Sequence, residues 1–337
     1  MRKLLVVLVI AVLAAGTLFA GGQTESGSAE VQKPVALKWA HVYETGEAFH
    51  KYALYAAEEI EKRTDGRYTI EVFPASSLGK ESDITQGLSL GTVDIIYAGA
   101  AFIGNTYGPI AMAEAPFMFK NFDHWNKFAA SDLFAELADG YADASGGNKV
   151  TAVTYYGARN VTSNKPINVP ADMKGLKIRV PNAPLYLMFT EAVGANAAPI
   201  AFAEVYLALQ QGVVDAQENP LPTIQAKKFY EVQEYINLTK HITNNLLTIV
   251  GANTWNKLSD ADKAIFDEVM KEGAAKASAA IDKSEVDLIP WFRDQGVTVN
   301  EDVQRDKFIE MVAPSLTNSP RMTWTKEHYQ RMQALAK

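Results

Sequence analysis

The sequence contains no cysteine among its 337 residues. This excludes disulfides, thiolate nucleophiles and thiolate metal sites, and it removes the residue to which a lipid anchor would be attached. Only five histidines occur, and none has the His-Glu-x-x-His spacing or another ligand spacing of a zinc site. Gly-x-Gly-x-x-Gly, the P-loop and Gly-x-Ser-x-Gly are also missing. We therefore expect no cofactor, no metal and no enzymatic activity.

Positive charge is scarce as well. The chain has 32 Lys and Arg against 39 Asp and Glu, which gives a formal net charge of −7. Proteins that bind nucleic acid neutralise phosphates with clustered Lys and Arg. We therefore expect no nucleic-acid partner, and anionic lipid is disfavoured for the same reason.

Long apolar runs are confined to the N-terminus. Two basic residues precede an apolar stretch from Leu4 to Ala15, and Leu18-Phe-Ala20 fits a small-residue cleavage site. This pattern predicts a signal peptide over residues 1–20; the stretch is short for a membrane span, and an uncleaved anchor is the alternative. Residues 21–33 are small and polar and predict a flexible leader. We expect the signal peptide to be cleaved near Ala20. The mature protein is then expected to be a periplasmic monomer that is free in solution.

The mature chain of about 300 residues is longer than a single hydrophobic core usually supports, and this length predicts two lobes. Strand and helix patterns alternate, and this βαβαβ rhythm predicts a mostly parallel sheet with helices on its faces. The first part predicts strands at 35–42, 68–73 and 93–97 and helices at 47–63 and 80–90. The rhythm then restarts, with strands predicted at 150–156, 177–180 and 213–216 and helices at 185–193 and 203–211.

A long helix is predicted near the C-terminus. Ser259-Asp-Ala-Asp262 resembles a capping box, and apolar residues follow it at helical spacing to about Leu288, just short of Pro290. At 1.5 Å per residue, some thirty residues would span about 45 Å. A helix of that length is expected to brace both lobes.

Two arginines stand at predicted strand ends, where open α/β sheets bind ligands. Arg179 lies in an apolar strand that ends at Pro181, and Arg159 follows Thr154-Tyr-Tyr-Gly-Ala. A planar guanidinium suits a carboxylate, because it can donate two parallel hydrogen bonds. A structural ion pair is the alternative for each arginine. No nucleophile or base stands near the turn Gln217-Glu218-Asn219-Pro220, so the pattern favours capture of a carboxylate without chemistry.

Several motifs, taken together, resemble the substrate-binding component of a tripartite ATP-independent periplasmic (TRAP) transporter over nearly all of the mature chain. They are Pro74-x-x-x-Leu78-Gly79 with Glu81, Gly91-Thr-Val-Asp94, Thr162-Ser-Asn-Lys-Pro166, Asp172-Met-Lys-Gly-Leu-Lys-Ile-Arg-Val-Pro181, Phe202-Ala-Glu-Val-Tyr-Leu-Ala-Leu-Gln210 and Asp215-Ala-Gln-Glu-Asn-Pro220. Two positions depart from the family pattern: Ala203 stands where Ser is frequent, and Ala216 where Gly is common.

The resemblance implies an α/β fold of two lobes, of the type II periplasmic binding protein kind. Crossing strands and a long bracing helix would join the lobes, which close on a ligand. We place the first lobe at 34–156 and 245–284, and the second at 157–244 and 285–337. The partners implied are a small carboxylate-bearing ligand and the membrane subunits of the transporter. An exported enzyme of the same shape and a receptor ectodomain are the alternatives of other classes.

The resemblance also assigns site residues. It implies that Arg179 grips the ligand carboxylate, that Arg159 and Asn219 face the same cleft, that Phe202 forms a wall and that Glu81 contacts polar groups. From the residues themselves we add His41, Glu44 and Asn160 as groups that would bind ligand hydroxyls. If Glu81 is ionised, it would repel a second carboxylate. We therefore expect a sugar acid, a hexuronate such as glucuronate or galacturonate; sialate and a C4-dicarboxylate or keto acid are the alternatives.

Overall fold

A sheet of nine strands runs through the chain in a computed structural model that describes residues 33–337. The strands are β1 (Val35–Ala40), β2 (Tyr68–Phe73), β3 (Ile95–Gly99), β4 (Lys149–Ser163), β5 (Lys177–Val180), β6 (Asn196–Pro199), β7 (Ala216–Asn219), β8 (Tyr235–Val250) and β9 (Thr298–Asn300). Their order is β2-β1-β3-β8-β4-β7-β5-β6, and β9 pairs with β8 outside this path.

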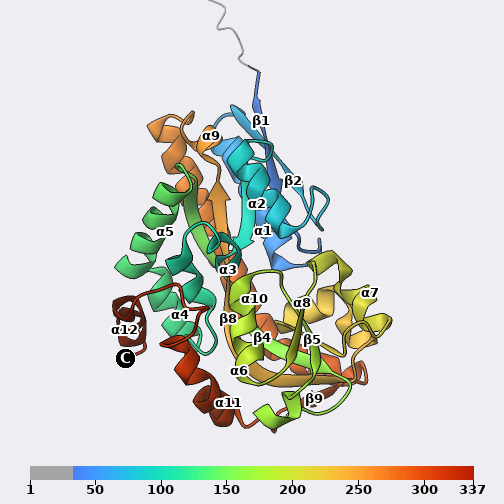
Figure 1. Cartoon of the computed structure of the whole chain (residues 1–337). Helices are drawn as coiled ribbons and strands as arrows, with labels where there is room; N and C mark the ends of the chain where they lie inside the picture. Colours follow the sequence, from blue (N-terminus) through green and yellow to red (C-terminus); the bar gives the residue numbers. More distant parts are fainter. Residues whose placement is uncertain (1–32) are drawn as a thin grey trace, which may run out of the picture. The chain divides into compact units, whose positions relative to one another are not determined.

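The helices pack around this sheet (Figure 1). The α-helices are α1 (Ala48–Arg63), α2 (Glu81–Leu90), α3 (Ala100–Ile103), α4 (Phe122–Ala129), α5 (Asp132–Ala144), α6 (Leu187–Ala192), α7 (Val205–Gln210), α8 (Leu221–Ala226), α9 (Ala252–Trp255), α10 (Asp260–Asp294), α11 (Arg305–Val312) and α12 (Lys326–Ala334). Short 3₁₀ helices occur at Gly108–Glu114, Pro170–Met173, Pro184–Tyr186, Phe202–Glu204, Phe229–Glu231 and Ala313–Leu316.

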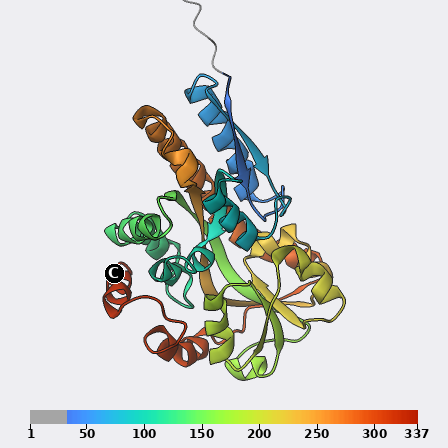
Figure 2. The same cartoon turned by 45° about the horizontal axis from the view of Figure 1, so that its top comes forward.

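The two ends of the sheet form two lobes, joined by the long strands β4 and β8 (Figures 1 and 2). We call the side with β2, β1 and β3 the first lobe and the side with β7, β5 and β6 the second. Neighbouring strands within each of these ends are parallel. The prediction of a mostly parallel sheet is wrong for the middle, because β8 runs antiparallel to β3 and β4, and β4 antiparallel to β7.

Strand β8 was not predicted from the sequence. Its sixteen residues include Asn237, His241, Asn244 and Asn245, all buried, so its pattern is not the apolar run expected of a central strand. These side chains are satisfied by hydrogen bonds to other buried groups; Asn237, for example, donates to the Val161 carbonyl at 3.1 Å. Buried polar networks of this kind are invisible to apolar periodicity.

Helix α10 confirms the predicted long helix and exceeds it. Ser259 caps its start by accepting from the Asp262 amide at 3.1 Å. The helix packs against α1 of the first lobe and against α8, which follows β7. It continues through Pro290 instead of ending before it. The carbonyl that loses its partner is that of Val286, whose side chain is 71% exposed, so water can satisfy it.

Strand β4 breaks its regular pairing between the two lobes. The register with β8 shifts between Tyr155 and Gly157, and Gly157 has a positive φ of 108°. A Cβ on Gly157 would lie 2.8 Å from the Cβ of Pro220, so only glycine fits. Glu285 of α10 accepts from the Ala158 amide at 2.6 Å and from the Tyr155 hydroxyl at 2.7 Å. These hydrogen bonds fix the part of β4 that directly precedes Arg159.

The chain after α10 contacts both lobes. Phe308 of α11 is fully buried in a cluster with Ile178 and Phe189 of the second lobe. Met332 of α12 belongs to the large core that contains Trp39 and Phe49 of the first lobe. The lobe boundaries given above stay a prediction.

The predicted signal peptide, and the leader up to residue 32, lie outside the described residues. Within residues 33–337, no helix has both the length and the apolar character needed to cross a membrane. The same part of the chain contains no group of three or more His, Asp or Glu side chains placed to hold a metal ion.

Candidate ligand-binding site

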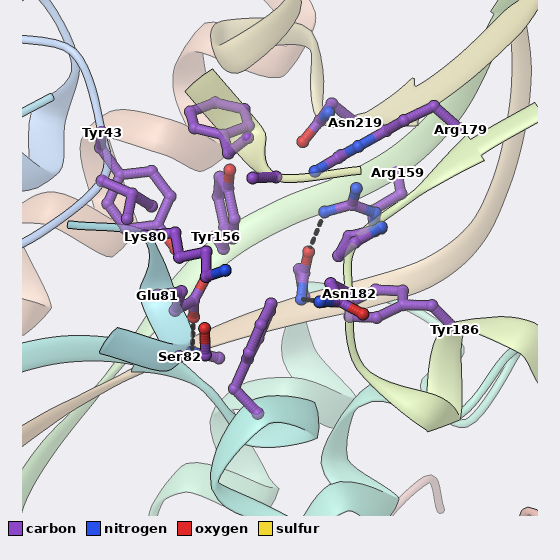
Figure 3. Close-up of a pocket in the computed structure, with 17 residues that line it drawn as sticks. Tyr43, Lys80, Glu81, Ser82, Tyr156, Arg159, Arg179, Asn182, Tyr186 and Asn219 are labelled. Carbon is purple, nitrogen blue, oxygen red and sulfur yellow. Dashed lines mark hydrogen bonds between the residues drawn. The ribbon is translucent and has the colours of Figure 1, made fainter. Parts of the chain in front are cut away.

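A cavity of about 550 Å³, which includes space open to solvent at its mouth, lies between the lobes (Figure 3). Its lining residues are Val42, Tyr43, Lys80, Glu81, Ser82, Gly99 and Phe102 from the first lobe, Tyr156, Arg159 and Asn244 from the crossing strands, and Arg179, Pro181, Asn182, Tyr186, Ala201, Phe202 and Asn219 from the second lobe. The cavity brings together five predicted site residues, Glu81, Arg159, Arg179, Phe202 and Asn219.

Arg179 presents unused donors inside this cavity. Its side chain is 2% exposed, and its Nε and Nη2 both donate to the Ile200 carbonyl, at 2.9 and 2.8 Å. The Nη1 atom is buried and has no hydrogen-bond partner. Burial and the neighbouring Arg159 lower the pKa of Arg179 to about 10, so it still carries its charge at neutral pH. A buried cation with a free N–H edge is a site for an anion.

Arg159, by contrast, is largely occupied by protein groups. It forms an ion pair with Glu218, with Nη2 donating to Oε1 at 2.8 Å and Nε to Oε2. Nη2 also donates to the Glu218 carbonyl, and Nη1 to Asn244. Burial acts to lower the pKa of Arg159, but the charge of Glu218 raises it above the usual arginine value. Of the five N–H groups, one on Nη1 is left for a ligand.

His241 completes the support of Glu218. It lies parallel to Phe189, with ring centroids 4.1 Å apart, and its Nε2 is 3.2 Å from Glu218 Oε2. Burial lowers the pKa of His241, so the ring is neutral, while Arg159 holds the pKa of Glu218 below its usual value despite burial. Because an ionised carboxylate only accepts, Nε2 must carry the proton. Nδ1 then accepts from the Thr239 hydroxyl at 2.8 Å.

The two arginines of the cavity therefore differ in whether a carboxylate compensates their charge. Glu218 neutralises Arg159, whereas Arg179 forms no ion pair with any described carboxylate. Lys80 is also without an ion pair among the described residues, but it is exposed at the mouth. One buried, uncompensated positive charge matches one carboxylate.

Glu81 starts helix α2 in the first-lobe wall. Its Oε1 accepts from the Gly99 amide at 2.7 Å. A Cβ on Gly99 would lie 3.2 Å from a Glu114 oxygen and 3.5 Å from Glu81, so glycine leaves room for both carboxyl groups. Burial raises the pKa of Glu81 to about 8, and the nearby Glu114 acts in the same direction. The premise that Glu81 is ionised at neutral pH is therefore not supported; the protonated group can donate to a ligand oxygen.

A Glu81→Gln variant should flatten the dependence of stability on pH. The folded pKa of Glu81 is about 8 against an ordinary 4.5. Between these values the folded protein keeps a proton that the unfolded chain releases, so the free energy of unfolding falls as pH rises. Urea titrations at pH 5 and pH 8 should show the parent losing about 3 kcal/mol more than the variant. Glu47, whose pKa burial raises to about 7, titrates in both proteins and cancels. Parallel pH profiles would contradict this assignment.

The remaining walls are aromatic and amide groups. Tyr43 lies 6.0 Å from Phe202 and 5.2 Å from Tyr156, measured between ring centroids, so rings from both lobes meet beside the cavity. Asn219, at the end of β7, donates its amide to Gln217 at 2.6 Å, which fixes its orientation next to Arg179 (Figure 3).

Three predicted ligand residues lie outside the cavity lining. His41 is buried and its Nδ1 accepts from the Tyr43 amide at 3.2 Å, so it supports a wall residue. Glu44 is paired with Lys227. Asn160 follows Arg159 on β4, and its side-chain oxygen accepts from the Lys240 amide at 3.2 Å.

Several lining residues were not predicted from the sequence. Tyr43, Tyr156 and Tyr186 have the pattern of core residues, and Asn244 lies on the unpredicted β8. Asn182 had a usable signal, because it follows Pro181 directly after the strand that carries Arg179.

Comparison with known proteins matches the chain to one family of solute-binding proteins. The model of the family "Bacterial extracellular solute-binding protein, family 7" matches residues 39–321. The sialic acid-binding periplasmic protein SiaP of Vibrio cholerae is 35% identical, over 82% of this chain and 86% of that protein.

Two solved TRAP periplasmic solute-binding proteins have the same fold. The protein from Roseobacter denitrificans, with bound L-galactonate, is 32% identical with a TM-score of 0.82, covering 90% of this chain and 98% of that one. The protein from Polaromonas, bound to D-erythronate, is 29% identical with a TM-score of 0.84 and the same coverage.

The fold and the cavity between the lobes are those of a two-lobed solute-binding protein. The chain belongs to the bacterial extracellular solute-binding proteins of family 7, the substrate-binding proteins of TRAP transporters.

Proposed function

We propose that this protein captures a monocarboxylate sugar acid in the periplasm and delivers it to the membrane subunits of a TRAP transporter. The observation that carries the proposal is the buried Nη1 of Arg179, which has no partner within the protein. Arg159 and Asn219 lie beside it and add donors for the same carboxylate (Figure 3). We place no catalytic step in this cavity.

The cavity lining beyond Arg179 suits a hydroxylated ligand. Ser82, Asn182 and the protonated Glu81 offer donors and acceptors for hydroxyl groups. Tyr43 and Phe202 present aromatic surface on which a sugar can pack. We propose a hexuronate such as galacturonate as the first candidate, since a pyranose ring has flat apolar faces. The bound L-galactonate and D-erythronate of the two relatives make aldonates the second candidate.

The cavity has only one uncompensated buried cation among the described residues, which disfavours dicarboxylates. Glu81 is mostly protonated at neutral pH and repels a second carboxylate only weakly. A second carboxylate would instead lack a buried cation and would have to reach Lys80 at the mouth. Burial of an unpaired charge is costly, so succinate should bind more weakly than the sugar acids.

Calorimetric titration tests this proposal. The panel is glucuronate, galacturonate, L-galactonate, sialate and succinate, with glucose as the uncharged control. We expect a sugar acid to bind most tightly and glucose not to bind. Tighter binding of succinate than of every sugar acid would overturn the ligand class. Recovery of the unchanged acid, monitored by NMR, separates capture from turnover by an enzyme.

Ligand should also bring the lobes together. Arg179 and Asn219 belong to the second lobe and Glu81 to the first, so a ligand that touches both favours the closed form. Small-angle scattering with the tightest acid of the panel should show a smaller radius of gyration than without it. An unchanged radius would mean that this acid binds without closure.

A further inference from the structure

An ion pair joins the two lobes beside the cavity without lining it. Glu44 lies between β1 and α1 of the first lobe, and Lys227 directly follows α8 of the second. Lys227 Nζ donates to Glu44 Oε1 at 2.7 Å, and the side chains are only 15% and 31% exposed, respectively. A pair this sheltered is screened less by solvent than an exposed one.

Lys227 also touches a wall of the cavity. Its Nζ lies 5.2 Å from the ring centroid of Phe202, within the range of a cation–π contact. Phe202 also contacts Tyr43 of the first lobe, which precedes Glu44 in the chain. Phe202 is therefore held on two sides, by a second-lobe cation and a first-lobe ring.

A hydrogen bond also joins the two lobes near this ion pair. Thr223 of α8 donates its hydroxyl to Glu47 Oε1 at 2.7 Å, and Glu47 Oε2 accepts from the Glu44 amide at 2.8 Å. Both Thr223 and Glu47 are buried. The loop that carries Glu44 is thus fixed on the same helix that Lys227 follows.

We propose that Glu44 and Lys227 are positioning residues that latch the lobes together and hold Phe202 in place as the wall of the closed cavity. Opening the lobes separates the pair and withdraws Phe202 from Tyr43. The latch therefore adds to the stability of the closed form whichever acid fills the cavity. The inference rests on the cavity being the ligand site, not on the identity of the sugar acid.

The absence of cysteine allows a clean measurement of closure. Leu54 on α1 and Leu207 on α7 are 48% and 52% exposed, so cysteines introduced there accept spin labels on opposite lobes. Pulsed electron paramagnetic resonance then gives the label distances without ligand and with L-galactonate or galacturonate. The variants are Lys227→Met, Glu44→Gln, their double mutant and the charge swap Glu44→Lys/Lys227→Glu. Lys127→Met is the matched control, since it breaks an ion pair with Asp123 inside helix α4.

We expect each single variant to lower the ratio of closed to open forms, and the affinity for the acid that binds, by about 3- to 10-fold. The double mutant should lose no more than either single variant, and the charge swap should recover most of the loss. Lys127→Met should match the parent. Unchanged distances and affinity in Lys227→Met, or additive losses in the double mutant, would overturn the latch. A labelled parent that shows no closed form under any condition would overturn it as well, whereas failure of every sugar acid to bind would overturn the proposed ligand class alone.

Discussion

An Arg179→Ala variant is expected to lose affinity for the sugar acid by about 30-fold to several thousand-fold. The ligand carboxylate would enter the closed cavity without its cation, which costs about 2–5 kcal/mol. Arg159 cannot replace Arg179, because Glu218 and Asn244 already take four of its hydrogen bonds. Calorimetry on the tightest acid of the panel measures the loss. Near-parent affinity in the folded variant would show that the carboxylate binds elsewhere.

Replacement of Arg179 should lower the affinity for the ligand but raise the stability of the ligand-free protein. Without ligand, Arg179 is a buried cation with an unpaired Nη1, and its lowered pKa shows that folding disfavours the charge. An Arg179→Met variant keeps much of the side-chain volume and should gain about 1–3 kcal/mol in the free energy of unfolding. Arg179→Lys should bind weakly, because an ammonium lacks the planar fork. Arg67→Ala, which breaks an ion pair with Asp262 away from the cavity, should leave affinity unchanged.

Sequence periodicity predicted some strands at the ends of the sheet better than those in its middle, although it missed β6 and placed β7 at 213–216 instead of Ala216–Asn219. β2 and β5 lie where the apolar alternation placed them, because each is a short strand of one lobe. β4 was predicted at 150–156 but extends to Ser163, beyond the register shift at Gly157. Polar residues fill the second half of β4 and much of β8. Crossing strands at a ligand site carry hydrogen-bonding side chains, so their sequences lose the apolar signal.

Buried polar side chains also limited the prediction of the site residues. Arg179 was predicted as a ligand residue because a charged residue in an apolar strand is conspicuous and the surrounding motif is long, and the structure places it in the cavity lining. His41 and Glu44 were assigned to the ligand from their residue types, yet each is used by the protein. Whether a polar residue binds ligand or a neighbouring element depends on contacts between distant segments. Glu44 and Lys227 are 183 residues apart in the chain, and no local pattern connects them.

A Glu218→Ala variant should lose about 3–5 kcal/mol of the free energy of unfolding, the largest loss of stability that we expect from the site. Glu218 is the buried acceptor for both Arg159 and His241. Without it, two guanidinium groups share a closed cavity with no compensating charge, and His241 loses its acceptor. Urea titration measures the loss. The double variant Arg159→Met/Glu218→Met removes both charges and should recover most of it, because apolar side chains often replace a buried ion pair without loss. A double variant no more stable than Glu218→Ala would show that Arg159 and Glu218 do not act as a pair, and that the charge balance inferred for the cavity is wrong.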